Sequence, residues 1–413
     1  MFKFIFSVFA AATSLISQPL QNDNGWRPAW GLDRIDQREA NLNDTYNYSF
    51  TGSGVTVYVF DSGINSSHNE FSGRVKPGFS VVSDGNGTED CTGHGTHSAS
   101  LIGGNIYGVA KNVQLIPVRV LNCFNGNPSS ATLFTAIDWI VQHHENGVPA
   151  VVNMSVGMPK STAFNEAVRT LIADGLIVVA AAGNQNKDAC LYSPASELSV
   201  ITVGGTDRTE LKGSYSNYGA CVDIFAPGSD LVGGWTGAPD TYRSSSGTSN
   251  AGPIVSGIAA LMLQENPSLT QAQVEEKLKS TATSGALFNI GAGSPNLLAY
   301  SNFSGQAASV VTVAPATTVV TTTTTVPATT TVAPTTTTVA PTTTTVVKTT
   351  TTTVAPTTTT VVQTTTTIAA PSVTNLPCKK AGTRTKFFNT PYVCVNIGNK
   401  LMWVSQRYSL GNP

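Results

Sequence analysis

The sequence predicts an α/β domain with a three-layer αβα arrangement, in which helices cover both faces of a parallel sheet. Two observations lead to this prediction. Runs rich in β-branched and apolar residues alternate with helical patterns through residues 19–303, and this alternation is typical of parallel sheets with crossover helices. Several of these runs also end in polar or glycine-containing turns, where open α/β sheets hold their ligands.

Strands are expected where β-branched, aromatic or apolar residues follow one another. These runs occupy residues 55–60, 113–120, 150–154, 176–182 and 199–203. Helices are expected from apolar residues at helical spacing and from capping signals. They occupy residues 98–103, 131–144, 162–174 and 270–280, with a further buried helix from about Ser249 to Asn266-Pro267. The helix at 270 opens with a capping box, Thr270 to Gln273.

The first residues have the composition of a secretory signal peptide. Lys3 precedes an apolar core, and residues 1–18 are predicted to be the leader. Cleavage after Ala12 and cleavage after Gln18 both remain open. The core is too short to span a membrane comfortably.

The C-terminal part divides into a linker and a small module. Residues 304–376 consist mostly of Thr, Val, Ala and Pro, with a repeated Val-Ala-Pro-Thr-Thr-Thr-Thr unit. Such a segment cannot bury a core, so it is expected to be a disordered linker or stalk. Residues 377–413 are predicted to form a small β module closed by a Cys378–Cys394 bridge.

Ser249 lies in the heptapeptide Gly247-Thr-Ser-Asn-Ala-Gly-Pro253, directly before the buried helix. Its hydroxyl is therefore expected at the first helical turn, where backbone N–H groups are unpaired and the helix dipole favours negative charge. A nucleophilic serine needs this geometry together with a base and an oxyanion donor. A serine at a helix start is also a common cap, and the heptapeptide alone does not decide between the two.

Two upstream residues favour the catalytic interpretation. Asp61 ends a predicted strand, and His94 is flanked by glycines that allow other groups to approach its ring. The order Asp, His, Ser is one of the known orders of serine-hydrolase triads. The surrounding motifs resemble the subtilase family, most of all its proteinase K branch, from about Trp30 to Asn302. The matching stretches are Val59–Ile64, Gly93–Ser98, Ala180–Asn184, Tyr192–Glu197, Ser216–Gly219 and Ser246–Ser249.

This resemblance implies a role for each residue. Ser249 is expected to attack the scissile carbonyl, His94 to act as general base and acid, and Asp61 to orient the imidazole. Asn184 is expected to donate its side-chain amide to the oxyanion, beside the backbone N–H of Ser249.

The resemblance also implies how a polypeptide substrate binds. The main chain of an extended substrate is expected to pair with an edge strand near Gly126. Two short stretches are expected to wall the first specificity pocket: Ser155, Val156, Gly157, Ala181, Ala182 and Gly183. Recognition through the main chain predicts broad specificity with an apolar bias.

Calcium and disulfides follow from the same resemblance. The carbonyls of Leu198 and Val200 and the carboxylate of Asp223 match a structural Ca²⁺ site of the proteinase K branch, and hard oxygen ligands suit that ion. The placement of the cysteines resembles aqualysin-like members, which implies the pairs Cys91–Cys123 and Cys190–Cys221. An exported chain with six cysteines is expected to use them in disulfides.

The net charge of −1 gives no indication of a nucleic-acid partner. The expected protein is a secreted, extracellular, monomeric serine endopeptidase, and its C-terminal module is interpreted as a possible cell-envelope attachment. Asn250, Gly252 and Pro128 depart from the family pattern. They support the alternative of a weakly active or inactive peptide-binding envelope protein on the same scaffold.

Overall fold

The computed structural model describes residues 15–20, 29–124 and 130–303, and four C-terminal strands within residues 374–405. The chain divides into two compact units, 1–318 and 319–413, which are treated separately. Among the described residues, no helix combines the length and the apolar character that crossing a membrane requires.

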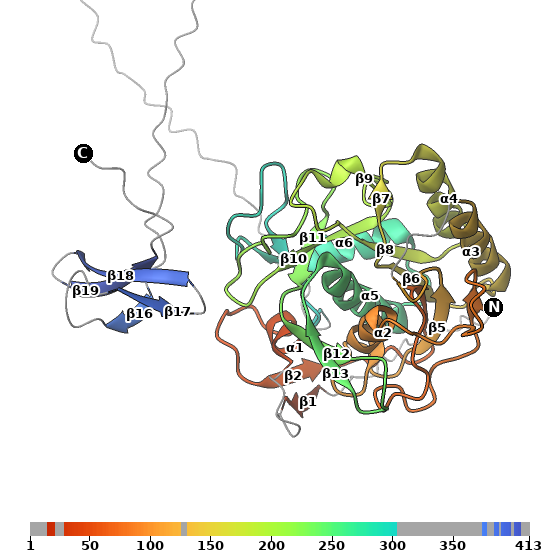
Figure 1. Cartoon of the computed structure of the whole chain (residues 1–413), viewed down its shortest axis with the longest axis horizontal. Coiled ribbons are helices and arrows are strands. Elements are labelled where there is room, and N and C mark those ends of the chain that lie inside the picture. The colour runs from red at the N-terminus through yellow and green to blue at the C-terminus, as the bar shows by residue number, and fades with distance from the viewer. Residues whose placement is uncertain are drawn as a thin grey trace, which may run out of the picture. The chain divides into compact units, whose positions relative to one another are not determined.

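A nine-stranded sheet forms the centre of the first unit, in the order β14-β15-β11-β10-β8-β6-β3-β5-β4. Figure 1 labels its strands β11, β10, β8, β6 and β5. All neighbouring strands run parallel except β14 and β15. The strands are β3 (Thr56–Asp61), β4 (Phe79–Ser80), β5 (Gln114–Arg119), β6 (Ala150–Met154), β8 (Ile177–Ala181), β10 (Ile201–Thr206), β11 (Ile224–Pro227), β14 (Thr283–Ser284) and β15 (Leu297–Leu298).

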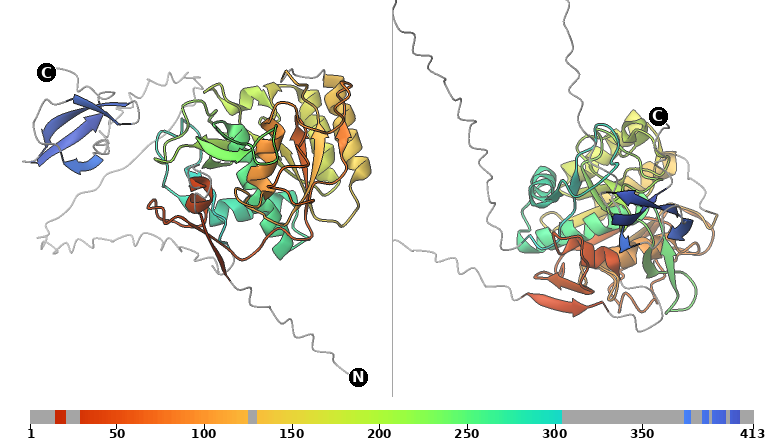
Figure 2. Two further views of the ribbon diagram at one scale, coloured as in Figure 1. Left: turned by 60° about the horizontal axis from the view of Figure 1, so that its bottom comes forward. Right: turned by 90° about the vertical axis from the view of Figure 1, so that its left-hand side faces the viewer.

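Helices cover both faces of this sheet, as the sequence predicts (Figure 2). Alternate residues of β3 enter two different cores. In the first core, Val57 and Val59 pack with α2 and α5; in the second core, Tyr58 and Phe60 pack with α3 and α4. The helices are α1 (Trp30–Ile35), α2 (His94–Gly103), α3 (Ser130–His143), α4 (Thr162–Ala173), α5 (Thr248–Glu265) and α6 (Gln271–Thr281), with a short 3₁₀ helix at Ala189–Leu191.

Shorter elements complete the unit. β12 (Leu231–Gly234) and β13 (Tyr242–Ser245) form a hairpin against α2, and β7 (Met158–Pro159) pairs with β9 (Tyr192–Ser193). α1, β11 and this hairpin were not predicted from the sequence. α2 was expected to start at Ser98, whereas the helix begins at His94, because Gly93 has a left-handed φ of 92° and ends the loop there.

The end of the expected leader is part of a strand. β1 (Ile16–Pro19) pairs antiparallel with β2 (Thr45–Tyr48), and Leu20 is buried in the first core. Cleavage after Ala12 would retain β1 in the mature protein, whereas cleavage after Gln18 would remove it.

The second unit contains an antiparallel sheet in the order β16-β19-β18-β17. Its strands are β16 (Thr374–Pro377), β17 (Arg384–Phe387), β18 (Thr390–Ile397) and β19 (Lys400–Ser405). The predicted Cys378–Cys394 bridge depends on Cys378, which lies outside the described residues.

Candidate active site

Asp61 is the last residue of β3 and its side chain is fully buried. Its Oδ1 accepts hydrogen bonds from Ser62 N at 2.7 Å and from His94 Nδ1 at 2.6 Å, and its Oδ2 accepts one from Ser98 Oγ at 3.0 Å. Because three donors bind its two oxygens, the carboxylate is fixed in one orientation. It therefore holds the histidine ring in a defined position.

His94 is the first residue of α2, and its side chain is 30% exposed. Gly93 precedes it with a left-handed backbone, and a Cβ there would lie 2.1 Å from the ring of Trp235. Because Nδ1 bonds to Asp61, Nε2 is the nitrogen left to exchange a proton with a substrate or nucleophile. Burial acts to lower the pKa of His94, but the negative charge and hydrogen bond of Asp61, with a smaller contribution from Asp90, raise the pKa above its ordinary value.

Ser249 is the second residue of α5, a long and mostly buried helix. Ser155 Oγ donates to the carbonyl oxygen of Ser249 at 3.2 Å and so connects the end of β6 to the start of α5. The helices that carry His94 and Ser249 pack against each other. Among the described residues, His94 and Ser249 form no mutual hydrogen bond, and such bonds often tighten only when substrate binds.

Asn184 faces the same small space as the Ser249 hydroxyl. Its Oδ1 accepts hydrogen bonds from Thr248 N and Thr248 Oγ1, both at 2.8 Å, so its amide nitrogen points the other way. A Cβ placed on Gly247 would lie 2.9 Å from Ser249 Oγ and 3.2 Å from Asn184 Nδ2. Ser249 Oγ and Asn184 Nδ2 therefore lie on the same side of Gly247 and close to each other. A hydroxyl can attack a carbonyl carbon, and a neighbouring amide donor can stabilise the resulting oxyanion.

The predicted substrate-binding stretches lie at the C-terminal ends of β6 and β8, which are neighbours in the sheet. Ser155 contacts Ser249 directly, and Val156 packs against the second core. Gly183 N donates to Thr248 Oγ1 at 3.0 Å, beside the end of β8. These contacts bring Ser155, Val156, Gly157, Ala181, Ala182 and Gly183 to the region where α5 starts. Gly126 lies outside the described residues.

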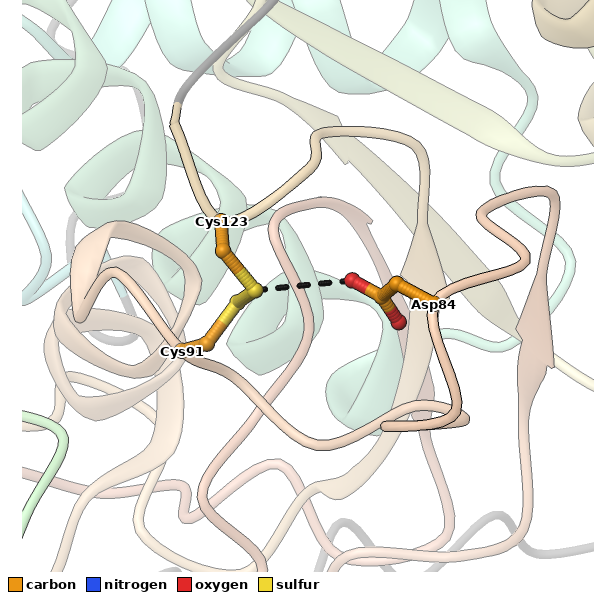
Figure 3. A group of neighbouring side chains, drawn as sticks. All are labelled: Asp84, Cys91 and Cys123. Atoms are coloured by element: carbon orange, nitrogen blue, oxygen red, sulfur yellow. Dashed lines mark hydrogen bonds between the residues drawn. A yellow bond between two sulfur atoms is a disulfide. The ribbon is translucent and has the colours of Figure 1, made fainter.

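The structure contains the pairs Cys91–Cys123 and Cys190–Cys221 as disulfides. Figure 3 shows the first of them beside the carboxylate of Asp84, whose oxygen lies 3.4 Å from Cys123 Sγ. Within the described ranges, these three side chains are the only His, Cys, Asp or Glu group with metal-like spacing. Because both sulfurs belong to a disulfide, they offer no thiolate ligand. The bridge instead ties the loop before His94 to the end of β5.

The predicted calcium ligands lie before the starts of two neighbouring strands of the sheet, β10 and β11. Leu198 and Val200 precede β10, and Asp223 precedes the adjacent β11. Burial raises the pKa of Asp223, which means that its carboxylate gains from a neighbouring cation. That cation is Lys279, whose Nζ lies 2.7 Å from Asp223 Oδ1, while Oδ2 accepts Thr202 N at 2.8 Å. Carbonyl and carboxylate oxygens are ligands that calcium prefers, but a calcium ion would have to displace Lys279 to bind Oδ1 of Asp223.

Three polar residues that hold the site were not singled out from the sequence. Thr248 orients the Asn184 amide, and Ser98 and Ser62 both hydrogen-bond to Asp61. Ser98 lies four residues after His94 on the same face of α2, but the predicted helix began only at Ser98, so this relation was not visible. Thr248 and Ser62 are adjacent to catalytic candidates but give no periodic signal.

Comparisons with known proteins match the part of the chain that carries these residues. A family model described as the subtilase family matches residues 52–293. Over 274 residues the chain is 49% identical to an extracellular serine proteinase of Thermus sp. (strain Rt41A), covering 66% of each chain. It is 46% identical to alkaline serine exoprotease A of Vibrio alginolyticus, covering 66% of this chain and 50% of that one. The chain therefore spans about half to two thirds of the length of these relatives.

A solved structure shows the same fold. The crystal structure of a cold-adapted subtilisin-like serine proteinase superposes with a TM-score of 0.63 and 46% identity, over 66% of this chain and 97% of that one. The family model covers more than half of the chain, and the solved structure shares its fold. From the order of its motifs, its fold and these matches, the chain belongs to the subtilase family.

Proposed function

We propose that this protein is a serine endopeptidase that hydrolyses peptide bonds with Asp61, His94 and Ser249. The observation that carries the proposal is the arrangement at the starts of α2 and α5. His94 is held by Asp61 through Nδ1, and Ser249 Oγ and Asn184 Nδ2 face one small space beside Gly247. Relatives named as serine proteinases support the same activity.

In the first half of the proposed reaction, Ser249 Oγ attacks the scissile carbonyl carbon while His94 Nε2 takes the hydroxyl proton. The carbonyl π electrons move to oxygen, and the resulting oxyanion is stabilised by Asn184 Nδ2 and the backbone N–H of Ser249. His94 then protonates the leaving amine, the C–N bond breaks and an acyl-enzyme remains. Asp61 stabilises the imidazolium present between these two proton transfers.

In the second half, a water molecule replaces the amine. His94 takes a proton from the water, whose oxygen attacks the acyl carbon, and the same two donors hold the second oxyanion. Collapse of this intermediate returns the proton to Ser249 Oγ and releases the carboxylic acid. In each half-reaction His94 therefore takes up one proton and releases one proton. Its ring must be neutral in the resting enzyme in order to take up the first.

The proposed substrates are extended polypeptides. The stretches Ser155–Gly157 and Ala181–Gly183 are proposed as the walls of the first pocket, and the Gly126 region as the edge that pairs with the substrate main chain. Such recognition supports broad specificity with an apolar bias. Nothing in the net charge of −1 suggests a nucleic-acid partner.

Secretion, a calcium site, a monomeric state and envelope attachment are also proposed. A relative named as an extracellular serine proteinase supports secretion, and the leader-like residues 1–18 are consistent with it. A calcium ion held by the carbonyls of Leu198 and Val200 and the carboxylate of Asp223 would cross-link two strand starts by electrostatic attraction. A monomeric state and envelope attachment through residues 377–413 stay predictions.

A fluorophosphonate reagent tests the proposal, because it reacts only with a serine that a neighbouring base activates. We expect labelling of the purified protein at Ser249, no labelling of S249A, and casein hydrolysis by the wild type alone. A folded wild type that binds peptides but is neither labelled nor active would support the alternative of an inactive peptide-binding subtilase. Circular dichroism of both proteins provides the folding control.

A further inference from the structure

Asp90 is a buried carboxylate in the loop before α2, with only 6% of its surface exposed. Its Oδ1 accepts hydrogen bonds from Ser62 Oγ at 2.9 Å, Thr92 N at 2.9 Å and Gly93 N at 3.0 Å. Its Oδ2 accepts two more from Thr96, from N at 2.9 Å and from Oγ1 at 2.7 Å. This one side chain therefore holds the backbone on both sides of His94.

Ser62 connects Asp90 to the rest of the site. Its Oγ donates to Asp90 Oδ1 and accepts Gly95 N at 2.9 Å, and its own backbone N–H donates to Asp61 Oδ1 at 2.7 Å. The residue directly after His94 is thus bound to the residue directly after Asp61. Asp90 anchors this link at its far end.

No cation neutralises Asp90, since no ion pair to it occurs among the described side chains. Its charge is balanced only by N–H and O–H donors near the start of α2, where the helix dipole also favours an anion. A buried carboxylate without a counter-ion acts on the nearest group that can become positive. That group is His94, whose pKa is raised in part by Asp90.

The other charged groups near α2 do not replace this effect. The elements and side chains packed around α2 contribute Asp61, Glu70, Arg74, Arg119, Arg243 and Glu265, and His97 lies on α2 itself. Glu70 and Arg74 contact the C-terminal end of α2 at Gly103 and Gly104, the end opposite His94. Arg119 is paired with Asp84, and Arg243 is stacked on Trp235. Burial lowers the pKa of His97 to about 4, which leaves it neutral near pH 7. Glu265 lies at the opposite end of α5, about 25 Å from its start at 1.5 Å per residue.

We propose that Asp90 is a positioning residue for His94: it fixes the histidine loop through Gly93, Thr96 and Ser62, and it supplies a second negative charge that stabilises the imidazolium formed during catalysis. This inference rests on the proposed function, because it concerns the same proton transfers. Asp61 contacts the ring directly, whereas Asp90 acts through the backbone and through space.

The kinetic test is D90N, which keeps the shape of the side chain and removes its charge. We expect kcat to fall about tenfold with KM within about twofold, and the acid limb of the pH–rate profile to move down by roughly half to one pH unit, because the imidazolium loses stabilisation. E89Q is the matched control: Glu89 is the exposed neighbour of Asp90, and its carboxylate accepts hydrogen bonds from Ser66 N and Ser66 Oγ. Its rate and pH profile should match those of the wild type.

A second measurement does not depend on activity or on D90N alone. The chain has five histidines, so ¹⁵N-histidine NMR can follow the titration of His94 in the S249A background. We expect the His94 pKa to drop by roughly half to one unit on adding D90N, and by less on adding S62A, which keeps the Asp90 charge. If D90N does not fold, S62A decides the question. The proposal would be overturned if both the His94 pKa and kcat of S62A equal those of the parent protein.

The two proposals fail in different ways. An unchanged His94 titration and an unchanged pH profile in folded D90N would overturn the role of Asp90 while leaving the protease intact. A wild type without protease activity whose His94 pKa still responds to D90N would overturn the proposed function and support the electrostatic link.

Discussion

Gly247 offers a direct way to block the proposed oxyanion site with a single methyl group. An alanine Cβ at this position would lie 2.9 Å from Ser249 Oγ and 3.2 Å from Asn184 Nδ2, on the side of Gly247 where the substrate oxygen is proposed to bind. The backbone of Gly247 has φ 167° and ψ 162°, which is extended and open to alanine without strain. The methyl group therefore competes with the oxyanion rather than with the fold.

The expected loss can be estimated from the donors that become unusable. In a subtilisin, removing one side-chain oxyanion donor lowers kcat by about 10²–10³, equivalent to roughly 2.7–4 kcal/mol of transition-state stabilisation. A methyl group between Asn184 and Ser249 hinders at least this donor, so G247A should lose at least about 10² in kcat/KM. The closest contact is with the end of a rotatable side chain, so the melting temperature should change little.

The assay is hydrolysis of a chromogenic peptide by wild type, G247A and G252A, with melting temperatures measured alongside. G252A is the matched control, since a Cβ at Gly252 would meet Ala181 N and Asn153 Oδ1 at 3.6 Å, an ordinary contact. It lies inside α5, where alanine replaces glycine with a gain of about 0.5–1 kcal/mol in helix propensity. G252A should therefore remain active and equally or more stable.

Wild-type turnover in a folded G247A protein would refute the reasoning, because the position would then not border the reacting oxygen. An equal loss of activity in G252A would also contradict it, since both variants would then act through the entry of α5 and not through the oxyanion site.

Three further outcomes are expected. D61N should lower kcat by about 10⁴ and move the acid limb of the pH–rate profile to lower pH, because the carboxylate that raises the pKa of His94 is lost; ester hydrolysis across pH 5–9 measures both. In K279A, added calcium should raise the melting temperature more than in the wild type, because the Lys279 ammonium no longer occupies Asp223 Oδ1. Equal responses of the two proteins in a calcium titration would contradict competition between Lys279 and calcium. In S249A, the free energy of unfolding should fall by about 3 kcal/mol as the pH decreases from 6.5 to 4, because His97 binds a proton near pH 6.5 in the unfolded state but only near pH 4 in the folded state. Urea unfolding should show this pH dependence in S249A and not in S249A/H97Q.

Much of the fold could be predicted because its signals are local. The strand expected at 150–154 is β6, and the helix with the Thr270 capping box is α6, with both reciprocal hydrogen bonds in place. β11 was missed because Ile224–Pro227 is only four residues long and contains a proline, which does not suggest a strand. The hairpin β12–β13 was missed because Leu231–Gly234 is short and half glycine.

The sequence by itself determined the order and identity of the chemical groups: an acid after a strand, a histidine among glycines, a serine at a helix start and an asparagine after another strand. These follow from short-range propensities and from motifs in order. Only the tertiary structure decided which way each group points and which charges it meets. Thr248 turns the Asn184 amide toward Ser249, Asp90 holds both sides of His94, and Lys279 lies against Asp223. Each is a contact between chain segments whose partner no local pattern specifies, so packing has to settle it.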